Sequence, residues 1–258
     1  VWHYRDCLPV DRALLQEMNC TLSHRGPDDE ELSFDDEHGI GIGFRRLSII
    51  DLSPAGRQPM LNEDGSLWIA FNGEVYNFLA LRPELEKQGH RFRSQSDTEV
   101  ILHLYESVGE KLPSLLHGMF AFAIWDRKKQ QIFFGRDRLG KKPLYYYDDG
   151  KRLLFASELK AILKDPSVPR LINPQALAHY LTFGYVLAPL TIFEDIFQLP
   201  PACQMTYKPG KAEAVPYWDW FDDFQQAAEQ PQPVSEEEAR MQLRELLKTV
   251  VKERLISD

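Results

Sequence analysis

Apolar residues recur every three or four positions in several stretches of the chain, which is the spacing typical of amphipathic helices. The clearest stretch is 98–108, where Ile101 and Leu104 share one face. Asp97 stands at the N-cap position and Gly109 follows the last turn, so both ends of this helix are marked. The other predicted helices before the C-terminal region span 11–21, 79–88 and 174–181.

Between these helices lie short apolar or β-branched runs bounded by Pro, Gly, Asn and Asp, which is the pattern of strands. The predicted strands are 39–44, 47–50, 67–71, 119–126, 131–136, 143–147, 153–156 and 203–207. Asn72-Gly73 is a turn signal after the third run, and Asp149-Gly150 is a stronger one between two later runs. Strands joined by such turns pair antiparallel. Helical zones and antiparallel strand groups together predict a layered α+β fold.

The composition changes near residues 218–233, where acidic residues, Gln and Pro replace the apolar pattern, and we predict a linker there. After it, Ser235 and Glu238 form the sequence signature of a capping box. An amphipathic helix is predicted to begin there, and its apolar face needs a partner. We therefore expect one domain over 1–218, and a linker with the opening helix of a second, truncated domain over 219–258.

Composition and charge exclude several functions. The chain has 258 residues, 43% of them hydrophobic, so it can bury a sizeable core. Its 30 basic and 39 acidic residues leave a net charge of −9, and an acidic chain without a basic run is a poor partner for nucleic acid. The longest stretch without charged residues, 171–193, contains Asn, Gln, His and Pro, which indicates a buried soluble segment. We expect neither a nucleic-acid nor a membrane partner.

Cysteine and histidine usage argues against a metal site and favours a reducing compartment. Three cysteines, far apart and odd in number, argue against a disulfide framework, and the default location is cytoplasmic. The seven histidines form no close pair along the chain, and Cys-x-x-Cys is absent, so no metal site is expected. The residues shown open without a secretory signal.

Four polar clusters stand beside the predicted strands and turns. Arg46 offers a planar fork for a ligand carboxylate, although a snorkelling surface arginine would give the same pattern. Asp97, with Glu74, can accept from a ligand ammonium; otherwise Asp97 is a helix cap and Glu74 a solvated turn acid. The Asn72 amide and the Gly73 N–H can form an oxyanion hole, or simply a turn. Together these groups suit an amino acid that carries a side-chain amide.

The clusters, at 24–28, 45–51, 72–77 and 96–99, resemble in this order the glutaminase domain of glutamine-hydrolysing asparagine synthetases. The resemblance covers nearly the whole chain and includes residues 118–123, 135–145 and 156–160. It implies an N-terminal-nucleophile hydrolase fold, a four-layer αββα sandwich of two antiparallel sheets between helical layers. It also implies that Asn72 and Gly73 form the oxyanion hole. The implied glutamine-binding residues are Arg46, Leu47, Ser48, Ile49, Ile50, Asn72, Gly73, Glu74 and Asp97.

In that family the mature chain begins with a cysteine whose thiol attacks the glutamine amide, with its own α-amino group as the base. The residues shown open at Val1 and lack that cysteine, and Cys7 has neither a free amine nor an evident base beside it. The resemblance implies a following synthetase domain that uses ATP and Mg²⁺ to make asparagine from aspartate. We expect no cofactor in this fragment. The expected partners are L-glutamine and the chain's own synthetase domain, and the family allows a homodimer.

Two other hypotheses are left open by the sequence. One is a non-catalytic module of another ATP-dependent synthetase, such as one that forms a β-lactam, and the other is an amidotransferase with a different acceptor. Residues 24–28 are predicted to order the loop near the glutamine site. Residues 135–145 have the glycines and basic residues of a phosphate loop without its spacing, so we interpret them as a structural hairpin loop.

Overall fold

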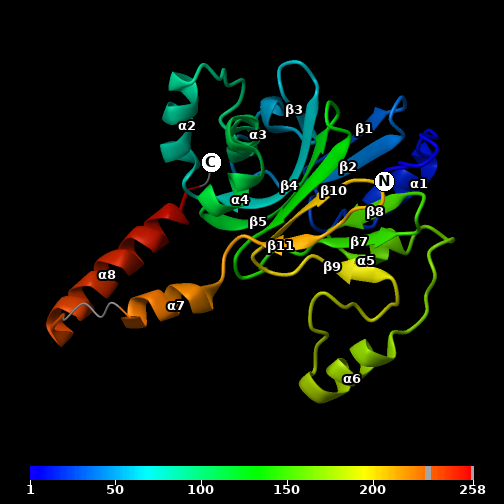
Figure 1. The fold of residues 1–258 in the computed structure, drawn as a ribbon. Coiled ribbons are helices and arrows are strands. Elements are labelled where there is room, and N and C mark those ends of the chain that lie inside the picture. The colour runs from blue at the N-terminus through cyan, green and yellow to red at the C-terminus, as the bar shows by residue number, and fades with distance from the viewer. Residues whose placement is uncertain (230–233, 257–258) are drawn as a thin grey trace.

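The computed structural model describes residues 1–229 and 234–256, which fold around two antiparallel sheets (Figure 1). The larger sheet has six strands in the order β11-β10-β6-β5-β4-β3. Its strands are β3 (Met60–Leu61), β4 (Leu67–Val75), β5 (Gly118–Asp126), β6 (Gln131–Arg136), β10 (Cys203–Tyr207) and β11 (Ala214–Pro216). The long pair β4–β5 aligns Asn72 with Ala121 and Ala70 with Ala123, so small side chains surround the polar one on that face.

The second sheet consists of two pieces that meet at Trp2. The first piece pairs β1 (Asp29–Asp35) with β2 (Ile40–Arg46), and the second places β7 (Tyr145–Asp148) between β8 (Leu153–Ala156) and β9 (Ile196–Gln198). Trp2 forms antiparallel bridges to Ile40 of β2 and to Leu153 of β8. Because Trp2 is also buried in the core between the sheets, it joins the two pieces into one surface.

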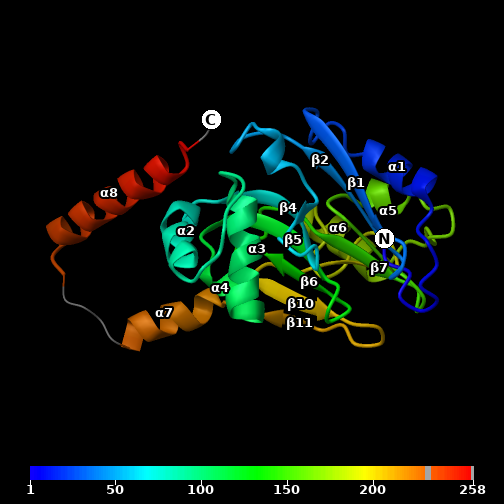
Figure 2. The ribbon, with the colours of Figure 1, turned by 90° about the horizontal axis from the view of Figure 1, so that it is seen from above.

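Helices cover the outer face of each sheet (Figure 2). The helices α2 (Phe78–Lys87) and α3 (Asp97–Val108) lie over the six-stranded sheet, and α1 (Arg12–Cys20) and α5 (Leu159–Ile162) lie over the second sheet. One hydrophobic core fills the space between the sheets, and one core lies under each helical layer. The predicted α+β fold with antiparallel sheets is confirmed, and the layers follow in the order helix, sheet, sheet, helix.

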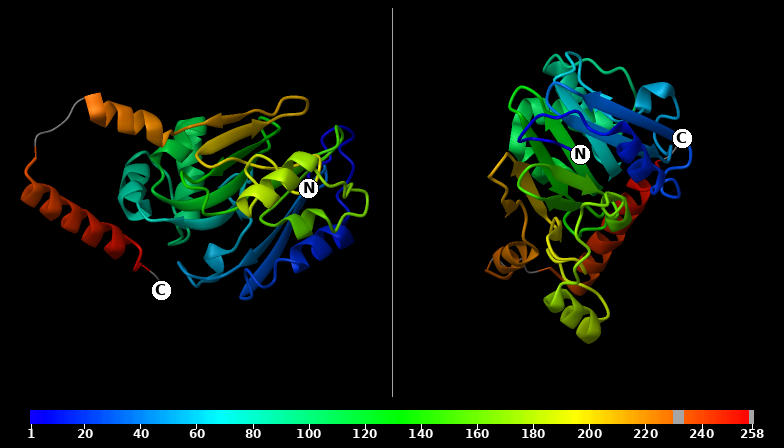
Figure 3. Two further views of the ribbon diagram at one scale, coloured as in Figure 1. Left: turned by 90° about the horizontal axis from the view of Figure 1, so that it is seen from below. Right: turned by 90° about the vertical axis from the view of Figure 1, so that its right-hand side faces the viewer.

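The remaining helices lie at the edges of this body. They are η1 (Pro54–Gly56), η2 (Gly109–Lys111), α4 (Leu112–Leu115), α6 (Pro174–Phe183), α7 (Trp220–Glu229) and α8 (Glu236–Glu253). The helix α6 projects from the side of the second sheet, and α7 leads away from the sandwich (Figures 1 and 3). The helix α8 runs back toward the sandwich, where Arg254 stacks on Tyr76 and Ile256 packs against the core. No helix in residues 1–229 and 234–256 is both long enough and apolar enough to span a membrane.

Two predictions near the candidate site, one of a strand and one of a turn, are wrong. Residues 47–50 form an irregular loop, because their backbone is held by side chains instead of a partner strand; the Ser48 N–H, for example, donates to the Asp28 carboxylate at 2.8 Å. Asn72-Gly73 does not form a turn. It lies inside β4, which stays paired with β5 up to Val75.

The start of α3 also differs by one residue from the prediction. The N-cap is Ser96, whose hydroxyl accepts from the Thr98 N–H, and Asp97 is the first helical residue. The other end is as predicted, with Gly109 at the C-cap and a positive φ of 58°. The carboxylate of Asp97 therefore also bonds to the neighbouring strand, where it accepts from the Val75 N–H.

The described part of the C-terminal region contains two helices. Helix α7 occupies most of the stretch 218–233 that was predicted as a linker, because Trp220, Phe221 and Phe224 give it an amphipathic pattern; residues 230–233 and 257–258 lie outside the described residues. The predicted capping box of Ser235 and Glu238 is confirmed at the start of α8.

Candidate functional site

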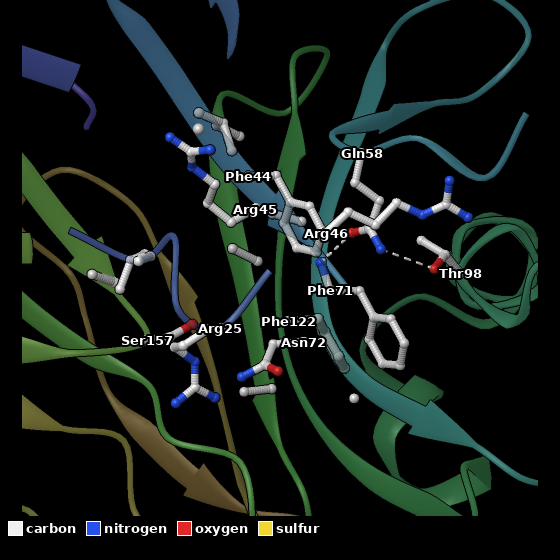
Figure 4. Close-up of a pocket in the computed structure, with 18 of the residues that line it drawn as sticks. Arg25, Phe44, Arg45, Arg46, Gln58, Phe71, Asn72, Thr98, Phe122 and Ser157 are labelled. Carbon is white, nitrogen blue, oxygen red and sulfur yellow. Dashed lines mark hydrogen bonds between the residues drawn. The ribbon is translucent and has the colours of Figure 1, made fainter. Parts of the chain in front are cut away.

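A cavity of about 420 Å³ lies between the two sheets and reaches the start of α3. Strand β2 and the loop after it line one side, β4 and β5 line another, and Ser157 lies at one end (Figure 4). The candidate residues on its wall are Arg46, Leu47, Ile49, Ile50, Asn72, Gly73, Glu74 and Asp97. Ser48 alone among the predicted glutamine-binding residues is not on the wall. The fold thus brings together groups that are far apart along the chain.

Asn72 extends from β4 into this cavity. Its Nδ2 is buried and has no hydrogen-bond partner within residues 1–229 and 234–256. Figure 4 shows its carboxamide turned toward the side where Arg25 and Ser157 lie. An unpaired buried donor costs roughly 1–3 kcal/mol, so a ligand oxygen that accepts from Nδ2 would recover that cost.

Gly73 is required by the close approach of β5. A Cβ on Gly73 would lie 2.1 Å from the carbonyl oxygen of Met119, so no other residue fits this position. The Asn-Gly pair therefore reflects tight strand pairing and not a turn. Glu74 follows in the same strand and is half-buried, which rules out the alternative of a solvated turn acid.

Arg46 is a buried side chain with 7% exposure, so the alternative of a snorkelling surface arginine is wrong. Its guanidinium donates to the carbonyl oxygens of Ser53 at 3.1 Å and of Asp51. The side chain runs toward Gln58 and Thr98 in Figure 4. In this structure Arg46 fixes the loop that follows β2, and this loop forms part of the cavity wall.

Asp97 is 4% exposed at the first position of α3. Its Oδ2 accepts from the Val75 N–H at 2.9 Å. Burial raises the pKa of Asp97 to about 6, against hydrogen bonds from Val75 and Thr98, and the negative charge of Glu74 acts in the same direction as burial. A cationic ligand group beside Asp97 would favour its ionised form, which is what recognition of an ammonium requires.

The loop at residues 24–28 orders the candidate site, as predicted. The Asp28 carboxylate accepts from the Ser48 N–H at 2.8 Å, and the Asp28 N–H donates to the Arg46 carbonyl at 3.0 Å. A Cβ on Gly26 would lie 2.3 Å from the carbonyl carbon of Arg45, so the loop packs directly on the end of β2. The sequence predicted that this loop has an ordering role, and these hydrogen bonds and close contacts show which residues it holds in place.

Glu158 ties this loop to the start of α5. It accepts from His24 at 2.9 Å, Arg25 at 3.1 Å and Lys160 at 3.0 Å. Burial acts to raise the pKa of Glu158, but the hydrogen bonds from Lys160, Arg25 and His24 hold it below its ordinary value. These residues form one charged group at the end of the cavity that Arg25 lines.

Two residues important for the site were not predicted to act in it. Gln58 accepts from the Phe71 N–H at 2.7 Å and donates to the Thr98 hydroxyl at 3.2 Å, so it connects β4 with α3. Asp51 accepts from the Gln95 N–H at 2.7 Å and thereby holds the loop after β2 against the loop before α3. No periodicity or motif marks Gln58, because its partners are fixed only by the packing of distant elements.

The loop at residues 135–145 is structural, as predicted, but it is not a hairpin, because it joins β6 of the six-stranded sheet to β7 of the second sheet. The Arg136 guanidinium donates to three carbonyl oxygens within 2.8 Å, and the Asp137 carboxylate accepts from several backbone N–H groups of the same loop. Both side chains are therefore occupied by backbone groups of the loop and of the neighbouring residues Leu199 and Phe120. Cys7 is exposed and is not on the cavity wall, and all three cysteines are free.

Comparison with known proteins places this geometry in a family. A family model for the glutamine amidotransferase domain matches residues 5–218. Glutamine-hydrolysing asparagine synthetase 1 of Bacillus subtilis (strain 168) is 43% identical over 196 residues, which are 76% of this chain and 30% of that protein. Amidase chry2 of Gibberella zeae is 34% identical over 257 residues, which are 96% of this chain and 36% of that protein.

Among solved structures, the glutamine phosphoribosylpyrophosphate amidotransferase from B. subtilis is 24% identical, with a TM-score of 0.48 over 69% of this chain and 35% of that chain. The family match covers most of the sequence, so the chain belongs to the class II glutamine amidotransferase domain family. The curated relatives that it resembles include glutamine-hydrolysing asparagine synthetases at about 40% identity. The chain spans about a third of the length of the curated relatives named above.

Proposed function

We propose that the cavity binds L-glutamine and that the chain is the glutaminase part of an asparagine synthetase. It hydrolyses glutamine to glutamate and ammonia, and the ammonia serves the ATP-dependent amidation of L-aspartate to L-asparagine. The observation that carries this proposal is the buried Nδ2 of Asn72, which has no partner among the described residues and lies in a cavity whose wall also contains Arg46 and Asp97. The similarity to a glutamine-hydrolysing asparagine synthetase supports it.

Each part of a glutamine molecule has a complementary group on the wall. Arg46, with the loop that it fixes, provides the site for the α-carboxylate. Asp97, with Glu74, accepts from the α-ammonium. The Asn72 Nδ2 and the Gly73 N–H stabilise the negative charge that develops on the side-chain amide oxygen. One such donor contributes about 3–4 kcal/mol to the transition state.

The nucleophile in this proposal is a cysteine that precedes Val1. Val1 lines the cavity, and the Gly41 N–H donates to its carbonyl at 2.8 Å. The cysteine sulfur bonds to the amide carbon while its proton passes to the α-amino group, and the C–N bond breaks as that proton moves to the departing ammonia. Water then cleaves the thioester, which releases glutamate and restores the thiol.

ATP and Mg²⁺ belong, in this proposal, to the synthetase domain and not to the residues described here. The loop 135–145 has a phosphate-loop composition, but Arg136 and Asp137 are occupied by backbone groups of the loop and of neighbouring residues, so it does not fit a nucleotide. The exposed apolar face of α8 is proposed to pack on the synthetase domain. The protein is proposed to reside in the cytoplasm, which is a reducing compartment. The apolar side chains of that face include Leu243, Leu246, Leu247 and Val251.

The test is glutamate release from glutamine by the native full-length protein, combined with mass spectrometry of its N-terminal peptide. We expect a free N-terminal cysteine and glutaminase activity. In the Asn72→Ala variant we expect kcat to fall by about 10²–10³-fold with little change in KM, because the lost donor acts mainly in the transition state. Gln175→Ala, which removes an exposed amide on α6, is the matched control and should keep full activity.

A mature chain that begins with a residue other than cysteine, in a folded protein that binds no glutamine by calorimetry, would overturn the proposal. That result would identify a non-catalytic module, such as one attached to a β-lactam-forming synthetase.

A second candidate function is an amidotransferase whose acceptor is not aspartate. The similarity to Amidase chry2 favours it, because that similarity extends over 96% of the chain and so continues beyond residue 218. The two candidates share the glutaminase reaction and differ in the acceptor. The test that separates them is ATP consumption by the full-length protein, supplied with glutamine and measured with and without aspartate. ATP consumption that depends on aspartate supports asparagine synthesis. Glutaminase activity without aspartate-dependent ATP consumption supports the second candidate.

A further inference from the structure

A group of metal-ligating side chains lies on α3 beyond the part that borders the glutamine cavity. The His103 Nδ1 lies 2.9 Å from the Glu106 Oε2, and the His90 Nδ1 lies 3.4 Å from the same oxygen. The two imidazole rings are 4.8 Å apart between centroids. His103 and Glu106 are neighbours on one face of the helix, and His90 reaches them from the loop after α2.

The spacing of these atoms matches a tetrahedral zinc site. One ligand atom from each residue lies within 4.8 Å of the other two. Zinc binds imidazole nitrogen and carboxylate oxygen at about 2.0–2.2 Å, which puts tetrahedral ligand atoms about 3.3 Å apart. The two distances to Glu106 bracket that value, so a small adjustment of the His90 side chain would complete the triangle.

A second set of polar groups orients each of the three residues. Asn62 donates to the other oxygen of Glu106 at 2.8 Å, and the Ser107 hydroxyl lies 2.9 Å from the His90 Nε2. The buried Nε2 of His103 has no hydrogen-bond partner within the described residues and faces the Glu99 carboxylate at 3.8 Å. A histidine that binds zinc through one nitrogen usually donates its other N–H to a carboxylate or hydroxyl. His90 has such a partner in the Ser107 hydroxyl, whereas the Glu99 carboxylate faces the His103 Nε2 from 3.8 Å, beyond hydrogen-bond distance.

The charges around the group also favour a cation. Glu106 forms its ion pairs with His90 and His103, and Glu63 adds negative charge near His103. A second histidine-carboxylate group, Asp35 with Glu37 and His38, is different, because Arg127 forms ion pairs with both of its carboxylates and already supplies the positive charge.

We propose that His90, His103 and Glu106 bind a zinc-type divalent transition-metal ion, with the fourth position open to water. Two nitrogens and one carboxylate oxygen are a donor set that zinc prefers over Mg²⁺ or Ca²⁺. His90 and Glu106 are partly exposed, which provides an entry path, while His103 is 1% exposed. The site lies on the same helix as Asp97, and Glu99 connects it to the loop before that residue by accepting from the Ser94 N–H at 2.8 Å.

Protons compete with the metal at this site. Burial lowers the pKa of His103, but the carboxylates of Glu106 and Glu99 favour the charged ring and raise the pKa to about 9. Binding of a metal through Nδ1 releases the proton from the imidazolium, so the affinity should rise between pH 6 and pH 8.

The test is calorimetric titration of the metal-free, full-length protein with zinc chloride, and with cobalt(II) for absorption spectroscopy. We expect the protein to bind one equivalent of zinc, and the His90→Ala variant to lose this binding. We expect Ser107→Ala to weaken the binding roughly 10-fold, because the Ser107 hydroxyl orients His90 without being a ligand itself. His117→Ala, which removes an exposed histidine elsewhere, is the matched control and should bind as the unmodified protein does. The cobalt spectrum should show tetrahedral geometry without the thiolate charge-transfer band that Cys7 or Cys20 would produce.

Equal zinc binding by His90→Ala and the unmodified protein would overturn the proposal, and so would the absence of any such equivalent at pH 8. Since His90 is at the surface of a loop, its substitution is expected to leave the fold intact, and circular dichroism of the variant checks this. Glutaminase activity is not the readout, so the result is independent of the proposed function.

Discussion

The Asp97 carboxylate accepts a hydrogen bond from the Val75 N–H at 2.9 Å. This contact joins the first residue of α3 to β4 two positions after Gly73, and it places a nearly buried carboxyl group beside the candidate oxyanion hole. The arrangement links the electrostatics of the site to the packing of a helix on a sheet. Changes at Asp97 should therefore alter both glutamine binding and stability.

Asp97→Asn should change how stability depends on pH. The pKa of Asp97 is about 6 in the folded chain and 3.8 in its ordinary state, so the native state binds the proton more tightly. The free energy of unfolding should therefore fall as pH rises from about 4 to 6, by at most about 1.4 kcal/mol per pH unit from this group. The asparagine variant cannot ionise and should lose this contribution in urea unfolding measured from pH 4 to 7. Asp6→Asn, at an exposed acid, should retain the slope.

Glutamine affinity should depend on the same proton. The ionised form of Asp97 pairs with an ammonium, so the Kd of the native protein for glutamine should rise as pH falls below about 6. Calorimetry over this range is the measurement. A Kd that does not change between pH 5 and 7 would show that Asp97 does not contact the ammonium.

Gly56→Ala should disturb the site through Arg46. A Cβ on Gly56 would lie 2.3 Å from the Nη2 of Arg46 and 2.9 Å from the Asp51 carbonyl oxygen, so the guanidinium must move. Crowding of this kind costs about 1–3 kcal/mol of stability. We expect a raised KM for glutamine and a lower urea midpoint, with Ala55→Ser at the exposed neighbouring position close to the native values. An unchanged KM would mean that the position of Arg46 does not matter for substrate.

Gln58→Ala should destabilise the chain although Gln58 belongs to no predicted motif. Its removal leaves the buried Phe71 N–H and the Thr98 hydroxyl without their partner, and one unpaired buried group costs about 1–3 kcal/mol. Thermal and urea unfolding should both show the loss, whereas Gln175→Ala should be neutral. Equal stability of the two variants would show that water replaces the Gln58 amide.

Arg46→Lys should not be a conservative change. The guanidinium contacts two carbonyl oxygens of the loop after β2, and a lysine ammonium lacks the planar set of donors that reaches both. We expect weaker glutamine binding and faster proteolysis of that loop, measured by calorimetry and by limited digestion. Arg57→Lys, an exposed arginine in the same region, provides the comparison.

Much of the fold was determined by local sequence. The strands 131–136, 153–156 and 203–207 have the predicted bounds, because turn residues and alternating apolar positions act over a few residues. The capping box of α8 and the C-cap of α3 are local for the same reason. The set of candidate groups could also be predicted, since Arg46, Asn72, Gly73, Glu74 and Asp97 do line one cavity.

Only the tertiary structure decided how those groups are held. Asn72-Gly73 resembles a turn until β5 pairs beside it, and Asp97 resembles an N-cap until Val75 supplies its partner. Likewise, His90 and His103 show no metal-site spacing along the chain, because a loop and a helix meet only after packing. Local sequence specifies the conformation of short segments, whereas hydrogen bonds and close contacts between distant segments depend on the assembled layers, and these contacts give each polar side chain its environment and its pKa.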